Sequence, residues 1–300
     1  MLLHRIRIPL IIIVTLVSLF QLNQLEFFFR TEIRQLFESA GSYRILIMYS
    51  LNGFIGFVVG AIPFVLIEMT SSNSRSREKL YERYAFPLII WACYYVISNI
   101  VVIITALLKK YFSFGFNDLS FDVPLFWHII LYVILIDFFG YWLHRLEHKI
   151  PFLWRFHSTH HSLKNITAFN QYGHWFEGMF RFFIVYLPVS LLISVPDFSA
   201  SSLAVIWGAW TLYIHTDSVD LCLPRWARYI FVDNLYHHYH HGYEKKYHDK
   251  NFSGIFSLWD IIFRTCLMPK NRGFPKTGLH YLEPPSSILE YIFHPFNRRQ

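Results

Sequence analysis

The 300-residue sequence has few cysteines and few charged residues, and both shortages exclude common classes of protein. Its three cysteines, Cys93, Cys222 and Cys266, show no C-x-x-C spacing, so neither a disulfide framework nor a thiolate zinc site is predicted. Charged residues make up only 16% of the chain, against roughly 25% in soluble proteins. Hydrophobic residues account for 54% and aromatic residues for 20%, which favours an integral membrane protein.

Motifs for nucleotides and nucleic acids are missing as well. The glycines from Gly56 to Gly60 lie inside an apolar run and form no dinucleotide fingerprint, and we find no flavin, haem or iron–sulfur module. The net charge of +7 comes from basic residues dispersed along the loops that flank apolar runs, an ordinary topological signal, so nucleic-acid binding is not expected. The chain has no internal repeat, and we expect one domain over residues 1–300.

Long apolar runs predict an all-α membrane protein with about four transmembrane helices. They extend from about Ile8 to Leu22, Ile45 to Met69, Ala85 to Leu108 and Val123 to Leu143. A bilayer core requires about 20 such residues, so the first run is interpreted as a short anchor that is retained.

A second kind of membrane contact is expected later in the chain. The shorter apolar runs Phe180 to Val195 and Phe198 to Ile214 predict a membrane-inserted hairpin, 180–214, and the tail Ser287 to Phe296 predicts a helix on the membrane surface. With a cytoplasmic amino terminus, few of the 27 basic residues fall in outside loops. The region after residue 143 is therefore expected on the cytoplasmic side.

Histidine is the residue that the chain has in excess, with sixteen in total and eleven from His144 to His241. Most of these eleven belong to three groups with helical spacing: His144 and His148; His157, His160 and His161; and His237, His240 and His241. Spacings of three and four bring imidazoles to one face of a helix. Because buried polar groups need partners, the groups predict metal binding, and eight or nine nitrogen ligands exceed what one ion can use, so two ions are implied.

The histidines alone leave the metal and the class of protein open. Imidazole suits iron, zinc and copper alike. Glu147 beside His148 only partly matches HExxH, so a zinc protease of that type is disfavoured. A zinc-binding, metal-transporting or lipid-binding protein without redox activity is the competing class, although a transporter would place its ligands within the spans. An ordinary core or surface role is expected for His4, His128, His248, His280 and His294.

The order H-x-x-x-H, H-x-x-H-H and a later H-x-x-H-H resembles the fatty acid hydroxylase/sterol desaturase superfamily of membrane di-iron enzymes. The resemblance covers about Asp137 to Thr265, close to half of the chain. Other short motifs that support the resemblance are Tyr141-Trp142, Pro151 with Leu153-Trp154-Arg155, Ile214-His215-Thr216, Lys250-Asn251-Phe252 and Leu258-Trp259-Asp260.

The resemblance implies a set of site residues. The metal ligands would be His144, His148, His157, His160, His161, His237, His240 and His241, with His215 as a ninth. His174 would either be a further ligand or support the ligands, and His238 shares the last group but not its face, so a supporting or surface role is expected. Asp137, Glu177 and Asp217 would accept the second ring N–H of ligating histidines. Three departures from the family pattern, Asn234, Trp175 and Arg264, leave the substrate open.

The resemblance also implies an activity. A cytoplasmic helical cap would hold two iron ions, with zinc possible in purified protein, and would use O2 to oxidise an unactivated C–H bond in a membrane lipid or sterol. Hydroxylation is favoured over desaturation. A separate cytochrome or ferredoxin would supply electrons, and Lys245, Lys246, Lys250, Lys270 and Arg272 offer a basic face for that donor or for lipid headgroups. A bacterial inner membrane and the endoplasmic reticulum fit equally.

Overall fold

The computed structural model of the chain describes residues 42–70, 84–96, 124–193, 207–271 and 273–297. Within these ranges the regular structure is helical, and extended pairing is limited to two isolated bridges, Phe231 with Phe256 and Gly242 with Thr277. The expected anchor at 8–22, the second half of the span expected at 85–108 and the centre of the expected hairpin, 194–206, lie outside the described residues.

Helix α4, Leu125–Lys149, is the one helix of the described residues that is long and apolar enough to cross a bilayer. The most apolar 18-residue stretch within Phe126–Lys149 has a mean hydropathy of 1.7, and only 22% of that stretch is buried inside the protein. The helix ends where Ile150 becomes extended, because Pro151 disfavours helical geometry in the residue before it. Pro151 in turn begins α5, Pro151–His161, so the two histidine-bearing helices meet at a sharp corner.

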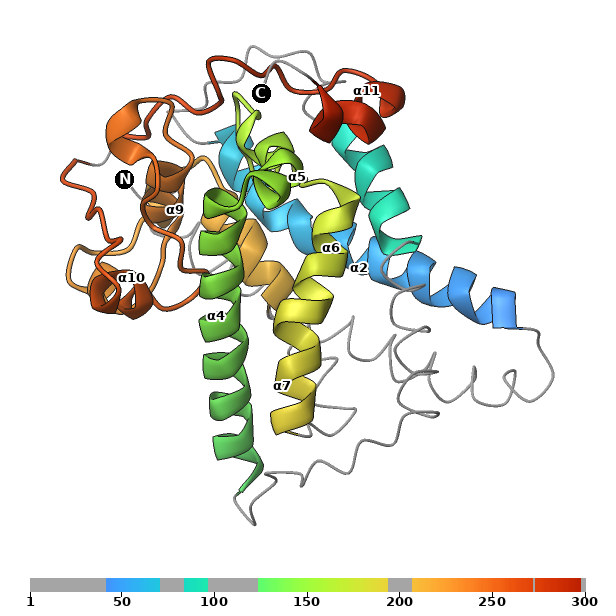
Figure 1. The fold of residues 1–300 in the computed structure, drawn as a ribbon, viewed down its shortest axis with the longest axis horizontal. Coiled ribbons are helices and arrows are strands. Elements are labelled where there is room, and N and C mark those ends of the chain that lie inside the picture. Colours follow the sequence, from blue (N-terminus) through green and yellow to red (C-terminus); the bar gives the residue numbers. More distant parts are fainter. Residues whose placement is uncertain (1–41, 71–83, 97–123, 194–206, 272, 298–300) are drawn as a thin grey trace.

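The described parts of two other apolar runs are helical as well. Helix α2, Ser42–Thr70, contains the run expected at 45–69 and accommodates Pro63 without ending. Its part Gly53–Met69 and the helix Phe86–Val96 are apolar but shorter than a bilayer span, and α2 runs obliquely to α4 (Figure 1). Of the four expected spans, α4 alone meets the criteria of both length and apolar composition among the residues whose side chains the structure describes.

The described ends of the expected hairpin are helical. Its first arm consists of α6, Trp175–Arg181, the π-helix η2, Phe182–Tyr186, and α7, Leu187–Leu192. This arm packs along α4 through a cluster of buried residues, Ile136, Leu143, Val185, Val189 and Ile193. The second arm returns as a helix at 207–215 and ends at His215, which brings that histidine back toward the others.

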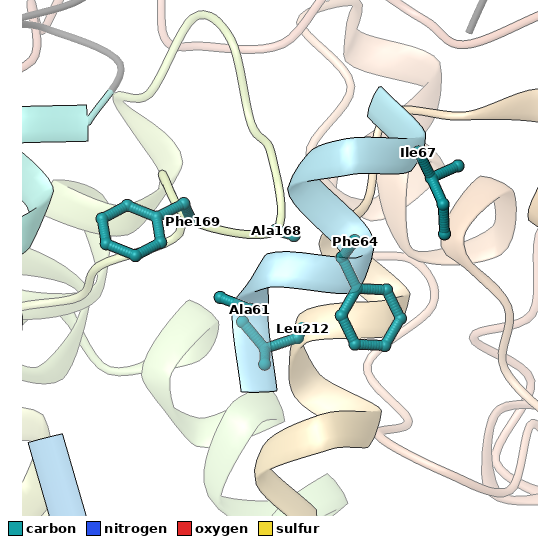
Figure 2. Packing of buried hydrophobic residues seen from close by; sticks show 6 residues of the cluster. All are labelled: Ala61, Phe64, Ile67, Ala168, Phe169 and Leu212. Atoms are coloured by element: carbon teal, nitrogen blue, oxygen red, sulfur yellow. The ribbon is translucent and has the colours of Figure 1, made fainter. Parts of the chain in front are cut away.

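A buried apolar cluster joins segments that are far apart in the sequence and fixes the frame of the histidine region (Figure 2). It combines Ala61, Phe64 and Ile67 of α2 with Ala168 and Phe169 of the loop after α5 and with Leu212 of helix 207–215. A neighbouring cluster of Ile214, Val232 and Tyr236 packs helix 207–215 against α9. Helix 207–215 is therefore held between α2 and α9.

The C-terminal third consists of short elements joined by loops. They are η3 Val219–Leu221, η4 Ala227–Tyr229, α9 Asn234–His240, η5 Lys245–Tyr247, α10 Leu258–Ile262, α11 Ile288–Phe293 and η6 His294–Phe296. The tail expected at 287–296 is helical and packs on the histidine region: the Tyr291 hydroxyl donates to the Gly173 carbonyl at 2.7 Å, and His294 Nδ1 lies 2.9 Å from Thr159 Oγ1. His294 is thus a bonded core histidine, as expected.

Candidate metal centre

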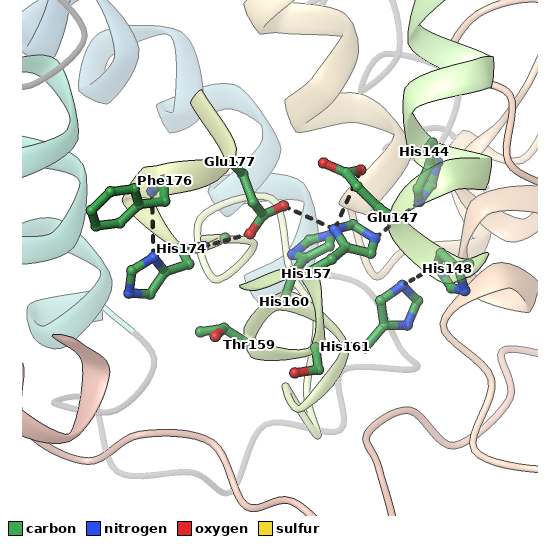
Figure 3. Close-up of polar contacts among 12 residues, drawn as sticks. His144, Glu147, His148, His157, Thr159, His160, His161, His174, Phe176 and Glu177 are labelled. Atoms are coloured by element: carbon green, nitrogen blue, oxygen red, sulfur yellow. Dashed lines mark hydrogen bonds and ion pairs between the residues drawn. The ribbon is translucent and has the colours of Figure 1, made fainter. Parts of the chain in front are cut away.

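Nine histidines converge in two adjoining clusters, and within each cluster the possible ligand atoms lie within 4.8 Å of one another. The first cluster contains His144, His148, His157, His161 and His240, and the second contains His160, His215, His237 and His241. Figure 3 shows how the histidines of α4 and α5 point toward each other. The two clusters are in contact, because the ring of His161 in the first stacks on the ring of His241 in the second, with centroids 4.4 Å apart.

The chain divides each histidine triplet between the two clusters. Residues four apart stay together: His157 and His161 belong to the first cluster, and His237 and His241 to the second. The middle residue of each triplet, His160 or His240, joins the opposite cluster. Successive helical residues turn by about 100°, so a residue at i+3 lies about 60° to one side of residue i while residue i+4 lies about 40° to the other. The expectation that each triplet forms a single face was therefore too coarse.

Distances between ring nitrogens match those of ligands on a common ion. His144 Nε2 lies 3.1 Å from His157 Nε2, and His148 Nε2 lies 3.1 Å from His161 Nε2. In the second cluster His215 Nε2 lies 2.9 Å from His237 Nε2. Two imidazole nitrogens bound to one ion with zinc-like bonds of about 2.1 Å are about 3.0 Å apart at a right angle and about 3.4 Å apart at a tetrahedral angle.

In most of these histidines the other ring nitrogen, Nδ1, lies near an acceptor that fixes the tautomer of the ring. In the first cluster, His144 Nδ1 lies 2.7 Å from the Phe252 carbonyl and His240 Nδ1 lies 2.7 Å from the Lys250 carbonyl. In the second cluster, His215 Nδ1 lies 2.7 Å from the Thr211 carbonyl, and His160 Nδ1 lies 3.4 Å from the Tyr172 carbonyl. A carbonyl only accepts, so these rings carry their proton on Nδ1 and direct the Nε2 lone pair inward.

This arrangement suits a bound cation. The inward lone pairs of His160 and His215 face each other at 3.3 Å, and no proton lies between them once both Nδ1 atoms are protonated. His240 Nε2 is buried and accepts no hydrogen bond from a described residue. A metal ion in each cluster would satisfy both features, and a donor set made of imidazoles suits iron, zinc or copper. The residues therefore fit two metal ions.

Burial favours the form of histidine that binds metal. It lowers the pKa of His157 to about 3 and that of His160 to about 4. The positive charge of Arg181 lowers the pKa of His157 further, and the neighbouring His157 imidazole lowers that of His160. Burial likewise holds the pKa values of His161, His237, His240 and His241 well below their ordinary value. The imidazoles are therefore neutral at physiological pH, and metal binding need not displace protons from them.

Two carboxylates lie beside the first cluster. Glu177 Oε2 lies 2.8 Å from His157 Nδ1, while Glu177 Oε1 accepts from the backbone N–H of His174 at 2.6 Å and so caps α6 (Figure 3). Glu147 Oε2 lies 3.7 Å from the same His157 nitrogen. Glu147 is fully buried, and neither of its oxygens accepts a hydrogen bond from a described residue. Sequence reasoning missed Glu147, although its position between His144 and His148 was a signal.

Three other predicted site residues lie outside both clusters. His174 is the N-cap of α6, where its Nδ1 accepts from the Phe176 N–H at 3.3 Å. His238 is buried, with its Nδ1 2.7 Å from the Asn234 carbonyl. The backbone N–H of Asp217 donates to Glu68 Oε1 at 2.9 Å, a contact that ties the turn after His215 to α2. These residues act on backbone segments next to the ligands, and direct ligation by His174 has no geometric support.

Asp137 differs from its predicted role. Its carboxylate accepts from the backbone N–H groups of Ile255 and Phe256 and from Trp259 Nε1, at 2.7 to 2.9 Å, instead of from a histidine ring. The Asp137 carboxylate thereby holds the loop 249–256. In this loop the carbonyls of Lys250 and Phe252 accept hydrogen bonds from the Nδ1–H groups of His240 and His144. The effect of Asp137 on the site is thus exerted through this loop.

A second aspartate holds the same loop from the other side. The buried carboxylate of Asp260 accepts from the N–H groups of Phe252 and Ser253 and from the hydroxyls of Thr265 and Tyr236, at 2.7 to 3.1 Å. The Asn251 side chain donates to the Tyr236 carbonyl and to the Leu267 carbonyl, each at 3.0 Å. The segment Lys250-Asn251-Phe252 is therefore a rigid support for one ligand from α4 and one from α9.

Comparison with known proteins agrees with this geometry. Residues 129–265, which include all nine clustered histidines, match the family model described as fatty acid hydroxylase. This segment is therefore similar to the fatty acid hydroxylase/sterol desaturase superfamily. The resemblance seen in the sequence is thereby confirmed.

Several curated relatives are similar to part of this chain. Human alkylglycerol monooxygenase is 29% identical over 150 residues, which cover 49% of this chain and 32% of the human protein. An ornithine lipid hydroxylase from Rhizobium tropici is 25% identical, with 59% of this chain and 52% of that protein covered. A putative Delta(7)-sterol-C5(6)-desaturase from Arabidopsis thaliana is 26% identical, with 48% and 50% covered. The chain thus spans about a third to a half of these relatives, and no solved structure matches significantly.

Two departures from the superfamily pattern have structural consequences. Arg264 stands where glycine is usual and has a φ of 61°, a left-handed conformation that costs a residue with a side chain about 1–2 kcal/mol. Asn234, at the usual proline, donates from Nδ2 to the carbonyls of Thr216 and Ser218 at 2.9 and 2.7 Å. Asn234 thereby joins the start of α9 to the turn after His215.

Proposed function

We propose that this chain is a membrane-bound oxygenase that hydroxylates an unactivated C–H bond of a lipid at a pair of iron ions. One observation carries the proposal: two adjoining clusters of buried imidazoles direct their Nε2 lone pairs inward, within a fatty acid hydroxylase segment. The relatives named above are a lipid monooxygenase, a lipid hydroxylase and a putative sterol desaturase. All three names refer to enzymes that oxidise lipids or sterols.

Each cluster would hold one iron, and the irons when bound would supply the activation of O2 that C–H oxidation needs. The overall change consumes the lipid R–H, O2, two electrons and two protons, and yields R–OH and water. The protein fixes the ligands: carbonyls of the 249–256 loop hold His144 and His240, and Glu177 holds the Nδ1 proton of His157. Because the second cluster is entirely buried, bulk water is kept away from it.

The location suits a substrate that arrives from the bilayer. His144 and His148 occupy the last two turns of α4, the candidate membrane span, and the centre therefore lies at one end of that helix. A lipid lying alongside α4 would present its chain to this end without leaving the membrane. The two electrons would come from a separate cytochrome or ferredoxin. Lys245, Lys246 and Lys270 are exposed and would form part of its docking face, although Glu244 pairs with Lys246 at 2.7 Å and reduces the charge there.

Lipid mass spectrometry of the purified full-length chain in vesicles tests the proposal. With iron, O2 and a reducing system, we expect a lipid product that has gained one oxygen. His160→Ala removes a ligand of the second cluster and should abolish the product, whereas His280→Ala changes an exposed histidine outside both clusters and should retain it. A protein that binds only zinc and yields no oxidised lipid would instead support the non-redox class.

A further inference from the structure

Two segments far apart in the sequence form one edge of the protein beside α4. The turn 224–231 is joined to the start of α10 by a hydrogen bond from Ser257 N to the Ile230 carbonyl at 3.1 Å. A second bond runs from Ser257 Oγ to the Arg228 carbonyl at 2.7 Å. Most of the exposed side chains of these two segments are apolar or aromatic, and we call six of them the apolar edge: Trp226, Tyr229, Ile230, Leu258, Ile261 and Ile262.

The polarity of these segments is reversed relative to a surface that faces water. Trp226 is 71% exposed and Ile262 is 60% exposed. Two charged residues of the same segments are buried: Arg228 is 4% exposed and forms an ion pair with Asp233 at 2.6 Å, and Asp260 is fully buried. Short turns in water normally present their charges outward and their large apolar side chains inward. The surroundings that suit this edge are therefore apolar.

The contacts of α10 fix its level along the candidate membrane span. Trp259 Nε1 donates to Asp137 of α4 at 2.9 Å, and the rings of Trp259 and Phe138 lie 5.1 Å apart. Helix α10 accordingly lies alongside α4 in Figure 1. Phe138 precedes His144 by six residues, a rise of about 9 Å in an α-helix. Helices that lie in a membrane interface bury their apolar face to about 5–10 Å, which agrees with this level.

We propose that the apolar edge is immersed in the interface of the bilayer that α4 crosses. Tryptophan and tyrosine are enriched at such a depth, and the isoleucines supply the apolar area that an interfacial element buries. Arg225 and Arg264 are exposed at the two segments, and their long side chains can extend to lipid phosphates while their stems remain in the apolar layer. The proposal goes beyond the proposed reaction: it depends on α4 crossing the membrane and not on the metal or the substrate.

Immersion has a consequence for the metal centre. Asp260 of α10 holds the backbone N–H groups of Phe252 and Ser253, and the Phe252 carbonyl receives His144. The element in the membrane and the support of a metal ligand are therefore one rigid unit. The bilayer would hold the metal centre near the level of the lipid headgroups.

Spin-label depth measurements on the full-length chain in phosphatidylcholine and phosphatidylglycerol vesicles test the proposal. In a background with the three native cysteines replaced by alanine, a label is placed by Trp226→Cys or Ile262→Cys. Leu131→Cys on α4 is the membrane reference, and Tyr243→Cys, at a residue 45% exposed away from the edge, is the aqueous control. Labels at 226, 262 and 131 should collide with O2 several-fold more than with a water-soluble nickel chelate, and the label at 243 should show the reverse.

Three results would overturn the proposal. Labels at 226 and 262 that behave like the label at 243 would place the edge in water. Labels shielded from both reagents, with spin–spin broadening between chains, would show that a second copy of the chain covers the edge. A reference label at 131 that is exposed to the chelate would remove the premise. Because the cysteine-free background could fail to fold, Trp226→Phe in the otherwise unaltered chain gives a second readout: brominated lipid should quench less of the total tryptophan fluorescence than in the wild type.

Discussion

Replacing Asp260 by asparagine tests how the 249–256 loop supports the metal centre. The carboxylate accepts four hydrogen bonds, two of them from backbone N–H groups of Phe252 and Ser253. In Asp260→Asn an amide NH2 replaces one oxygen, and one of these buried N–H groups then faces a donor. An unsatisfied buried donor costs about 1–3 kcal/mol, which is the expected loss in free energy of unfolding.

The effect on metal binding should be confined to one cluster. When the loop shifts, the Phe252 carbonyl no longer holds His144 Nδ1, and loss of such a support typically lowers metal affinity about 10- to 100-fold. We expect this loss in the first cluster and a smaller change in the second, measured by competition with a chelator and by metal content. Glu244→Gln, the same change at an exposed carboxylate, is the matched control and should alter neither. Unchanged affinity in Asp260→Asn, or an equal loss in both clusters, would refute this account of the loop.

Three further predictions concern stability and pH. Arg264→Gly should stabilise the protein by about 0.5–1 kcal/mol in a denaturant titration, because release of the left-handed strain exceeds the entropic cost of glycine; destabilisation would contradict the strain. Gly242→Ala should destabilise it by about 1–3 kcal/mol, because the added Cβ would overlap the Tyr247 ring. Because Gly242 directly follows His241, metal content should fall as well, and wild-type metal content would count against this packing. Below pH of about 6.5 His157 and His160 are protonated in the unfolded chain but stay neutral in the folded protein, because burial lowers their pKa values. The free energy of unfolding of the metal-free protein should therefore fall by up to about 1.4 kcal/mol per histidine and pH unit as pH falls toward 4. A flat profile of stability against pH, measured by circular dichroism, would disprove the neutral state.

The sequence predicted the helices of the metal centre better than its internal arrangement. Spacings of three and four placed the histidines on α4, α5 and α9, where they are found. The division of each triplet between two clusters depends on an angular difference of about 100° between residues i+3 and i+4, and it becomes visible only when neighbouring helices are in place. The single-domain organisation and the cytoplasmic placement remain predictions.

The supports of the ligands were the least predictable part. The acceptors for His144, His160, His215 and His240 are backbone carbonyls, which any residue type can provide and which leave no mark in a sequence. Asp137 was expected beside a histidine because ionisable groups in a membrane span often serve a site directly. Its partners lie more than 110 residues away in the chain, and only the fold brings them together.

The central claim, that two imidazole clusters each hold a metal ion, is tested most directly by the metal content of the purified full-length chain and two variants. We predict two irons per chain for the wild type. His144→Ala removes a ligand of the first cluster and His237→Ala one of the second, and each should lower the content toward one. An X-ray absorption spectrum should show a first shell made mainly of imidazole nitrogen. A single ion per chain that both substitutions remove equally, or two ions retained in both variants, would contradict the two-cluster account.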